Sequence, residues 1–151
     1  MKLRTSLISL LCTVIAALLA LLQPVSGQNS SKSNATYAEL AKAPEKARAK
    51  KNPLENDPEA VVAGRILFEQ HCAECHGETA GGGKKAPSLR APEVQNAEPG
   101  AIFWVLTNGV SRRGMPVWSK LPEPQRWQIV KFLKSLGTPP ANNTAAGPNS
   151  F

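Results

Sequence analysis

Two cysteines and a histidine stand close together in this 151-residue chain, in the order Cys72-Ala73-Glu74-Cys75-His76. This spacing is the attachment pattern of a c-type haem. The two thiols lie about one helical turn apart, so both can add to the vinyl groups on one edge of a porphyrin. The imidazole of His76 can then bind the iron from below. One short segment would therefore fix the cofactor, its orientation and its proximal ligand.

Two other interpretations of the cysteine pair are a redox disulfide and half of a zinc site. A redox motif is expected near a βαβ pattern, and no strand-like run precedes Cys72. A structural zinc site takes four ligands. The chain has 3 Cys and 2 His, and its remaining cysteine, Cys12, falls in a segment that we expect to be removed. Haem attachment is the favoured interpretation.

Met115 is the candidate for the second axial ligand. If Met1 leaves with the N-terminal segment, Met115 is the one methionine that remains of the 2 in the chain. Gly114 allows the backbone to approach a ring closely, and Pro116 stiffens the loop without needing a hydrogen-bond donor. The alternative is that Met115 only fills the core. His71 is the rival ligand, but it precedes Cys72 on the attachment side, so we expect it at the surface or rim.

Residues 1–27 have the parts of a secretory signal peptide. Lys2 and Arg4 supply the positive start, an apolar run follows, and Val25-Ser26-Gly27 offers small residues for cleavage before Gln28. The apolar run is slightly shorter than the roughly 20 residues of a membrane span. We therefore expect export to the periplasm. Retention of this segment as a membrane anchor is the alternative.

The rest of the chain divides into three parts. Residues 28–57 are polar and interrupted by proline, which predicts a linker that is partly helical or disordered. Residues 138–151 have the composition of a disordered tail. One domain therefore spans 58–137. Loss of 1–27 lowers the formal charge from +7 to about +5, and no cluster of basic residues is interleaved with aromatics, so nucleic acid is not an expected partner.

The domain is predicted to be all-α. Asp57-Pro58-Glu59 is a helix start that leads directly to Cys72. Two further helices are expected over 101–107 and 123–136, the second stopped by Gly137. Gly64 weakens the first helix, which suggests that another helix passes close over it. No convincing strand appears in the sequence.

At this point residues 58–137 resemble a class I cytochrome c, a small electron carrier whose three main helices wrap around one covalent haem. The matching residues, in family order, are Gly64-x-x-x-Phe68, His71-Cys72-x-x-Cys75-His76-Gly77, Pro87-x-Leu89, Gly114-Met115-Pro116 and Trp127 to Leu136. Pro122 departs from the pattern, because it stands where a Ser, Thr or Asp helix cap is expected.

The resemblance implies roles for several residues. Gly64 and Phe68 would cross Ile129 and Phe132 of the last helix. The pocket residues would be Pro87, whose carbonyl accepts the ring N–H of His76, together with Leu89 and Leu133. Apolar packing, to which Trp104 would contribute, would disfavour the extra positive charge of ferric iron.

The expected function is that of a periplasmic monohaem electron carrier, not an enzyme. Iron ligated by His76 and Met115 would cycle between Fe(III) and Fe(II), with redox proteins such as a dehydrogenase or an oxidase as partners. We expect a monomer. Two alternatives stay open: a haem enzyme or gas sensor with a labile sixth ligand, and a cytochrome subunit of a larger dehydrogenase or oxidase. In the second, residues 1–27 would be the anchor and 28–57 the spacer.

Replacing both Cys72 and Cys75 by Ala is expected to leave the chain largely unfolded. A domain of roughly eighty residues buries too little apolar surface to fold firmly without a staple such as a covalent porphyrin. Circular dichroism melting of the double variant measures this, with the haem-loaded protein as control. A cooperative, native-like melt of the haem-free variant would contradict the prediction.

Overall fold

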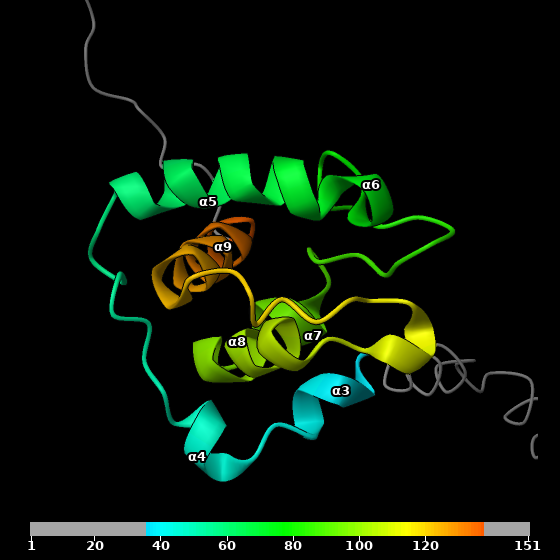
Figure 1. Ribbon diagram of the computed structural model, residues 1–151, viewed down its shortest axis with the longest axis horizontal. Helices are drawn as coiled ribbons and strands as arrows, with labels where there is room; N and C mark the ends of the chain where they lie inside the picture. The colour runs from blue at the N-terminus through cyan, green and yellow to red at the C-terminus, as the bar shows by residue number, and fades with distance from the viewer. Residues whose placement is uncertain (1–35, 138–151) are drawn as a thin grey trace, which may run out of the picture. The chain divides into compact units, whose positions relative to one another are not determined.

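The computed structural model describes residues 36–137, and the regular structure in this range is helical (Figure 1). The helices are α3 (Ala38–Ala41), α4 (Glu45–Arg48), α5 (Glu59–His71), α6 (Ala73–His76), α7 (Pro92–Gln95), α8 (Pro99–Asn108) and α9 (Glu123–Ser135), with a 3₁₀ turn η1 (Ser111–Arg113). Within these residues the one β-type contact is an isolated antiparallel bridge between Val110 and Met115. The prediction of an all-α fold is confirmed.

Helices α5 and α9 cross in direct backbone contact. A Cβ atom on Gly64 would lie 2.0 Å from the carbonyl oxygen of Gln128, so a hydrogen is all that fits there. Beside this point the rings of Phe68 and Phe132 lie 5.3 Å apart between centroids. Asp57 starts α5 by accepting the Glu59 backbone N–H at 2.9 Å, as the sequence predicted. The close passage expected at Gly64 is confirmed.

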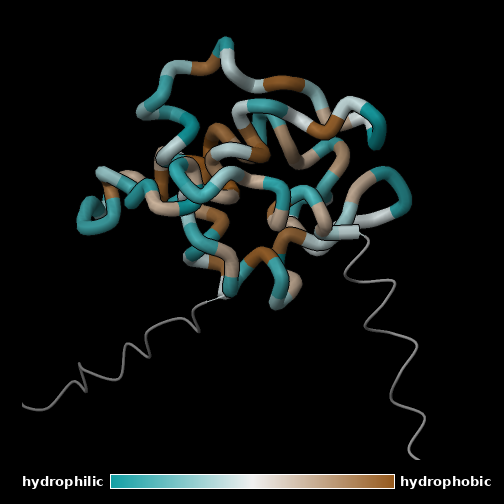
Figure 2. The backbone as a smooth tube through the Cα atoms, turned by 90° about the horizontal axis from the view of Figure 1, so that it is seen from below, coloured by the Kyte–Doolittle hydropathy of each residue, from teal (hydrophilic) through white to brown (hydrophobic). Residues whose placement is uncertain are grey.

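Helix α9 also packs on α8 through aromatic rings. Phe103 and Trp127 stack with centroids 4.0 Å apart, and the Trp127 indole N–H donates to Glu123 at 3.2 Å. Helix α9 begins at Glu123, directly after Pro122. A proline fits at this position because the N–H groups at the start of a helix have no partner within the helix, so the missing N–H of Pro122 costs no hydrogen bond. Hydrophobic stretches from these helices gather in the middle of the fold, while many outer loops are hydrophilic (Figure 2).

Residues 36–57 form part of the domain, which corrects the prediction of a linker for this stretch. The short helices α3 and α4 pack against α8 (Figure 1). A Cβ atom on Gly100 would lie 2.1 Å from the Ala47 carbonyl oxygen. Asn52 is buried and donates its amide to the Trp127 carbonyl at 3.0 Å. Such contacts produce no apolar periodicity in the sequence, because each is made by a single residue beside a turn.

Three predictions fall outside the described residues. The signal peptide at 1–27, the first part of the linker at 28–35 and the tail at 138–151 all lie there. Among residues 36–137, none of the helices has the length and hydropathy to cross a membrane.

Replacing Gly64 by Ala is expected to destabilise the domain by about 2 kcal/mol or more, because the new methyl group overlaps the α9 backbone. The matched control is Val62→Ala, which shortens a side chain of the same helix that is 57% exposed. We expect that control to stay within about 0.5 kcal/mol of wild type. Urea unfolding of the haem-loaded proteins gives both values. Equal stability of the two variants would rule out the tight crossing.

Candidate haem site

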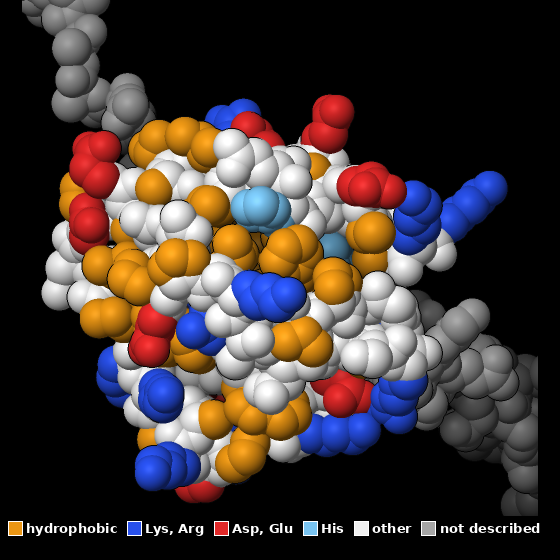
Figure 3. All heavy atoms as spheres, viewed as in Figure 1, with side chains coloured by type: hydrophobic (Ala, Val, Ile, Leu, Met, Phe, Trp, Pro, Cys, Tyr) orange, Lys and Arg blue, Asp and Glu red, His pale blue; other side chains and the backbone are white. Residues whose placement is uncertain are grey.

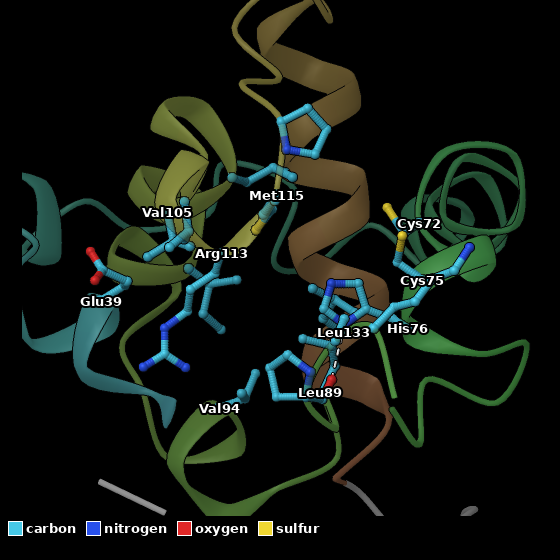
Figure 4. A pocket seen from close by; sticks show the side chains of 18 of the residues that line it. Glu39, Cys72, Cys75, His76, Leu89, Val94, Val105, Arg113, Met115 and Leu133 are labelled. Atoms are coloured by element: carbon cyan, nitrogen blue, oxygen red, sulfur yellow. Dashed lines mark hydrogen bonds between the residues drawn. The ribbon is translucent and has the colours of Figure 1, made fainter. Parts of the chain in front are cut away.

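A cavity of about 640 Å³ lies between α5, α6, α9 and the loops that face them (Figure 4). This volume falls within the range of about 300–1,000 Å³ typical of cofactor pockets. The buried residues that line it are mainly apolar: Phe68, Val94, Ile102, Leu106, Ile129 and Leu133. The cavity therefore suits a large apolar group.

Cys72 and Cys75 stand at one wall of this cavity, where α5 gives way to α6. Cys72 is the junction residue, and its N–H donates to the Phe68 carbonyl at 2.8 Å. Both cysteines are free and both line the cavity. Burial, and secondarily the nearby Cys75, raises the pKa of Cys72 to about 11. Cys72 lies within the wall and Cys75 is exposed, so an attached ring would have one thioether inside and one at the surface.

His76 is held in the cavity wall by one hydrogen bond. The residue is 8% exposed, and its Nδ1 lies 2.9 Å from the Pro87 carbonyl oxygen, the dashed line of Figure 4. Burial lowers the pKa of His76, and the bond to Pro87 opposes this in part. A neutral imidazole that donates from Nδ1 keeps a lone pair on Nε2 for a metal. The contact between Pro87 and His76 implied by the resemblance is present.

The glycine run after His76 brings Pro87 within reach. Gly82 has φ of +78°, and a Cβ there would lie 2.6 Å from the Pro87 carbonyl carbon and 2.4 Å from the Ser88 nitrogen. Its N–H donates to the His76 carbonyl at 2.8 Å. The chain thus folds back on itself around His76. Position 82 requires glycine because its φ is positive and a Cβ atom would overlap the backbone.

Met115 enters the cavity from a loop, whereas His76 enters it from the end of α6 (Figure 4). Val110 and Met115 exchange two backbone hydrogen bonds, at 2.9 and 3.2 Å, which close the loop at its base. Gly109 and Gly114 have φ of +65° and +81°, a conformation that favours glycine. The nitrogen donor and the thioether therefore face one apolar space from different elements.

The structure places the other predicted residues with one exception. Leu89 and Leu133 line the cavity, and His71 lies at its rim, where its ring packs on Trp118 at 5.3 Å. Trp104 does not line the cavity, because α8 presents Ile102, Val105 and Leu106 there instead. The predicted contribution of Trp104 to the pocket is therefore wrong.

Sequence analysis missed a wall of the cavity formed by α3. Tyr37, Glu39 and Leu40 line it, although we expected these residues in a linker. The spacing of Tyr37 and Leu40, one helical turn apart, was the available signal. It spans too few residues to stand out as a periodic pattern.

The donor set does not resemble a zinc site. Within residues 36–137, no three side chains of His, Cys, Asp or Glu are grouped to hold a metal ion. Two thiols at one edge, one imidazole and one thioether around an apolar cavity fit a planar apolar group with a metal at its centre.

Comparison with known proteins relates the chain to subunits of cytochrome c oxidases. The family model described as cytochrome C oxidase, cbb3-type, subunit III, matches residues 59–133. The cbb3-type cytochrome c oxidase subunit CcoP of Rubrivivax gelatinosus is 29% identical over 126 residues, which cover 80% of this chain and 41% of the relative. Subunit FixP of Sinorhizobium medicae is 30% identical over 92 residues, or 54% of this chain and 32% of the relative.

A third relative, subunit CcoP of an Azospirillum species, is 32% identical over 91 residues, again 54% of this chain, and 30% of the relative. The chain thus spans less than half the length of each of these relatives. The matched segment begins where α5 begins and ends within α9, so it contains both walls that hold the candidate donors. Residues 59–133 are therefore a c-type cytochrome domain of the class I kind, an electron carrier that holds one haem c by covalent bonds.

Proposed function

We propose that Cys72 and Cys75 attach the haem and that His76 and Met115 are its axial ligands. The observation that supports this is the cavity itself, which brings these four side chains around one apolar space. Pro87 would orient His76 through its hydrogen bond, and Leu89 and Leu133 would contact the ring. The bound haem would supply a one-electron Fe(III)/Fe(II) couple.

The protein would tune this couple by what surrounds it. A thioether ligand raises the reduction potential, and the buried leucines, isoleucines and phenylalanine exclude water from the cavity. With His76 and Met115 holding the iron, no position would be left for a substrate, so the domain would relay electrons without catalysis of its own.

Electrons would enter and leave at the face shown in Figure 3. Histidine side chains are visible there among hydrophobic ones. Cys75 is exposed, and Val117 on the Met115 loop is 51% exposed. A partner that covers this face would come close to the edge of the haem.

The partner that we propose is a membrane oxidase of the cbb3 type. This rests on the match of residues 59–133 to a subunit of that oxidase and on three relatives named as such subunits. It favours the oxidase-subunit alternative of the sequence analysis over a free carrier with unspecified partners. Residues 1–27, if retained, would tether the domain at the periplasmic face of the membrane.

Replacing Met115 by Ala is expected to abolish the weak far-red sulfur-to-iron absorption band of the ferric protein and to lower its reduction potential. Carbon monoxide should then bind the reduced variant readily at neutral pH, whereas wild type binds it poorly. The matched control is Val117→Ala, an exposed apolar residue of the same loop. A wild-type protein that already binds carbon monoxide readily would support the sensor or enzyme alternative instead.

Membranes that contain the oxidase are expected to oxidise the reduced, purified protein, and cyanide should stop the reaction.

The full chain expressed with its own N-terminus should sediment with membranes and keep the mass of residues 1–27. A variant in which a cleavable signal peptide replaces 1–27 is the matched control, and it should be recovered in the soluble fraction. A soluble native protein without 1–27, together with no cyanide-sensitive oxidation, would contradict the proposal.

A further inference from the structure

Helix α3 and the residue before it, Tyr37, contact two loops: the loop of Met115 and the loop of Pro87, whose carbonyl accepts from His76. The Tyr37 hydroxyl donates to the Ser88 carbonyl at 2.8 Å, one residue beyond Pro87, which accepts from His76. Two residues after Tyr37, Glu39 forms an ion pair with Arg112, which belongs to η1 just before Met115. One short segment therefore contacts both loops.

The carboxylate of Glu39 is well enclosed for a charged group. Its side chain is 17% exposed and lines the cavity, and Lys42 also contacts it at 3.1 Å. A carboxylate that has lost most of its contact with water is stabilised where cations or donors hold it. Since Lys42 is on the same segment, Arg112 is the partner that joins α3 to the Met115 loop.

The chain that follows α3 is anchored to the domain at independent points. The carbonyl of Ala47 lies where a side chain of Gly100 would stand, and Asn52 is hydrogen-bonded to Trp127. The residues that follow α3 are thus held on the domain by contacts outside the cavity. Helix α3, Ala47 and Asn52 all precede residue 59, where the match to the family model begins.

We propose that residues 36–41 are a strap that holds the Pro87 loop, which orients His76, and the Met115 loop at their working distance, with Tyr37 and Glu39 as its positioning residues. Tyr37 would hold the loop of Pro87, and Glu39 would hold the loop of Met115. The inference deepens the proposed function, because it rests on His76 and Met115 as the ligands. It assigns to a segment outside the family match a part in keeping both ligands in place.

Glu39→Gln and Tyr37→Phe test this by removing one contact each with little change of shape. Hydrogen exchange of the haem-loaded full chain should become roughly threefold to tenfold faster within 109–118 in Glu39→Gln. In Tyr37→Phe the same effect should appear within 86–90. Exchange in α5 and α9 should stay at wild-type rates. Reduced Glu39→Gln should also bind carbon monoxide faster than wild type.

The matched control is Glu45→Gln. Glu45 forms an exposed ion pair with Arg48 on α4, its side chain is 81% exposed, and it does not line the cavity. This variant makes the same change of charge on the next helix, outside residues 36–41, so neither loop should respond. Adding Arg112→Gln to Glu39→Gln should cause little further loosening, because the two residues act through one contact.

The strap is refuted if exchange in both loops matches that of Glu45→Gln, or if Glu39→Gln loosens α5, α9 and the loops to the same degree. The second result would mean general destabilisation. Exchange is measured on the isolated protein, so it gives an answer whether or not an oxidase is the partner. It also does so if Met115→Ala shows that Met115 is not a ligand.

Discussion

The backbones of α5 and α9 touch at Gly64, and the rest of the haem site depends on this contact. With the Gln128 carbonyl against its Cα, Gly64 allows α5 to lie directly on α9. The C-terminal end of α5 then delivers Cys72 to the same cavity that Leu133 of α9 lines. A wider crossing would separate the attachment segment from the apolar wall that must receive the ring.

The proposed ligands lie in less regular backbone, which is held by local hydrogen bonds rather than by packing of long helices. His76 ends a helix of a single turn, and Met115 lies on a loop. Each is held by backbone hydrogen bonds around a glycine of positive φ, Gly82 for one and Gly114 for the other. Ligand loops built in this way can hold a fixed geometry without long elements, because their own backbone groups are satisfied.

The segment before α5 shows how a small domain can be extended. The domain of residues 59–133 matches a subunit of cbb3-type oxidases, and residues 36–57 add to it a wall and a pair of contacts at the cavity edge. The part of this segment that the structure describes is thus packed on the domain rather than free of it.

The chemistry was decided by the sequence alone, because thiols and imidazole at Cys72, Cys75 and His76 are related by local spacing that any helix preserves. The tight crossing at Gly64 could also be predicted, since glycine in a helix has a known cost. Only the tertiary structure showed that Trp104 does not line the cavity. It also showed that Glu39 meets Arg112 from 73 residues away. Such contacts are made when folding brings distant side chains together. A helix as short as α3 also has too few residues for a hydrophobic periodicity that would predict its buried face.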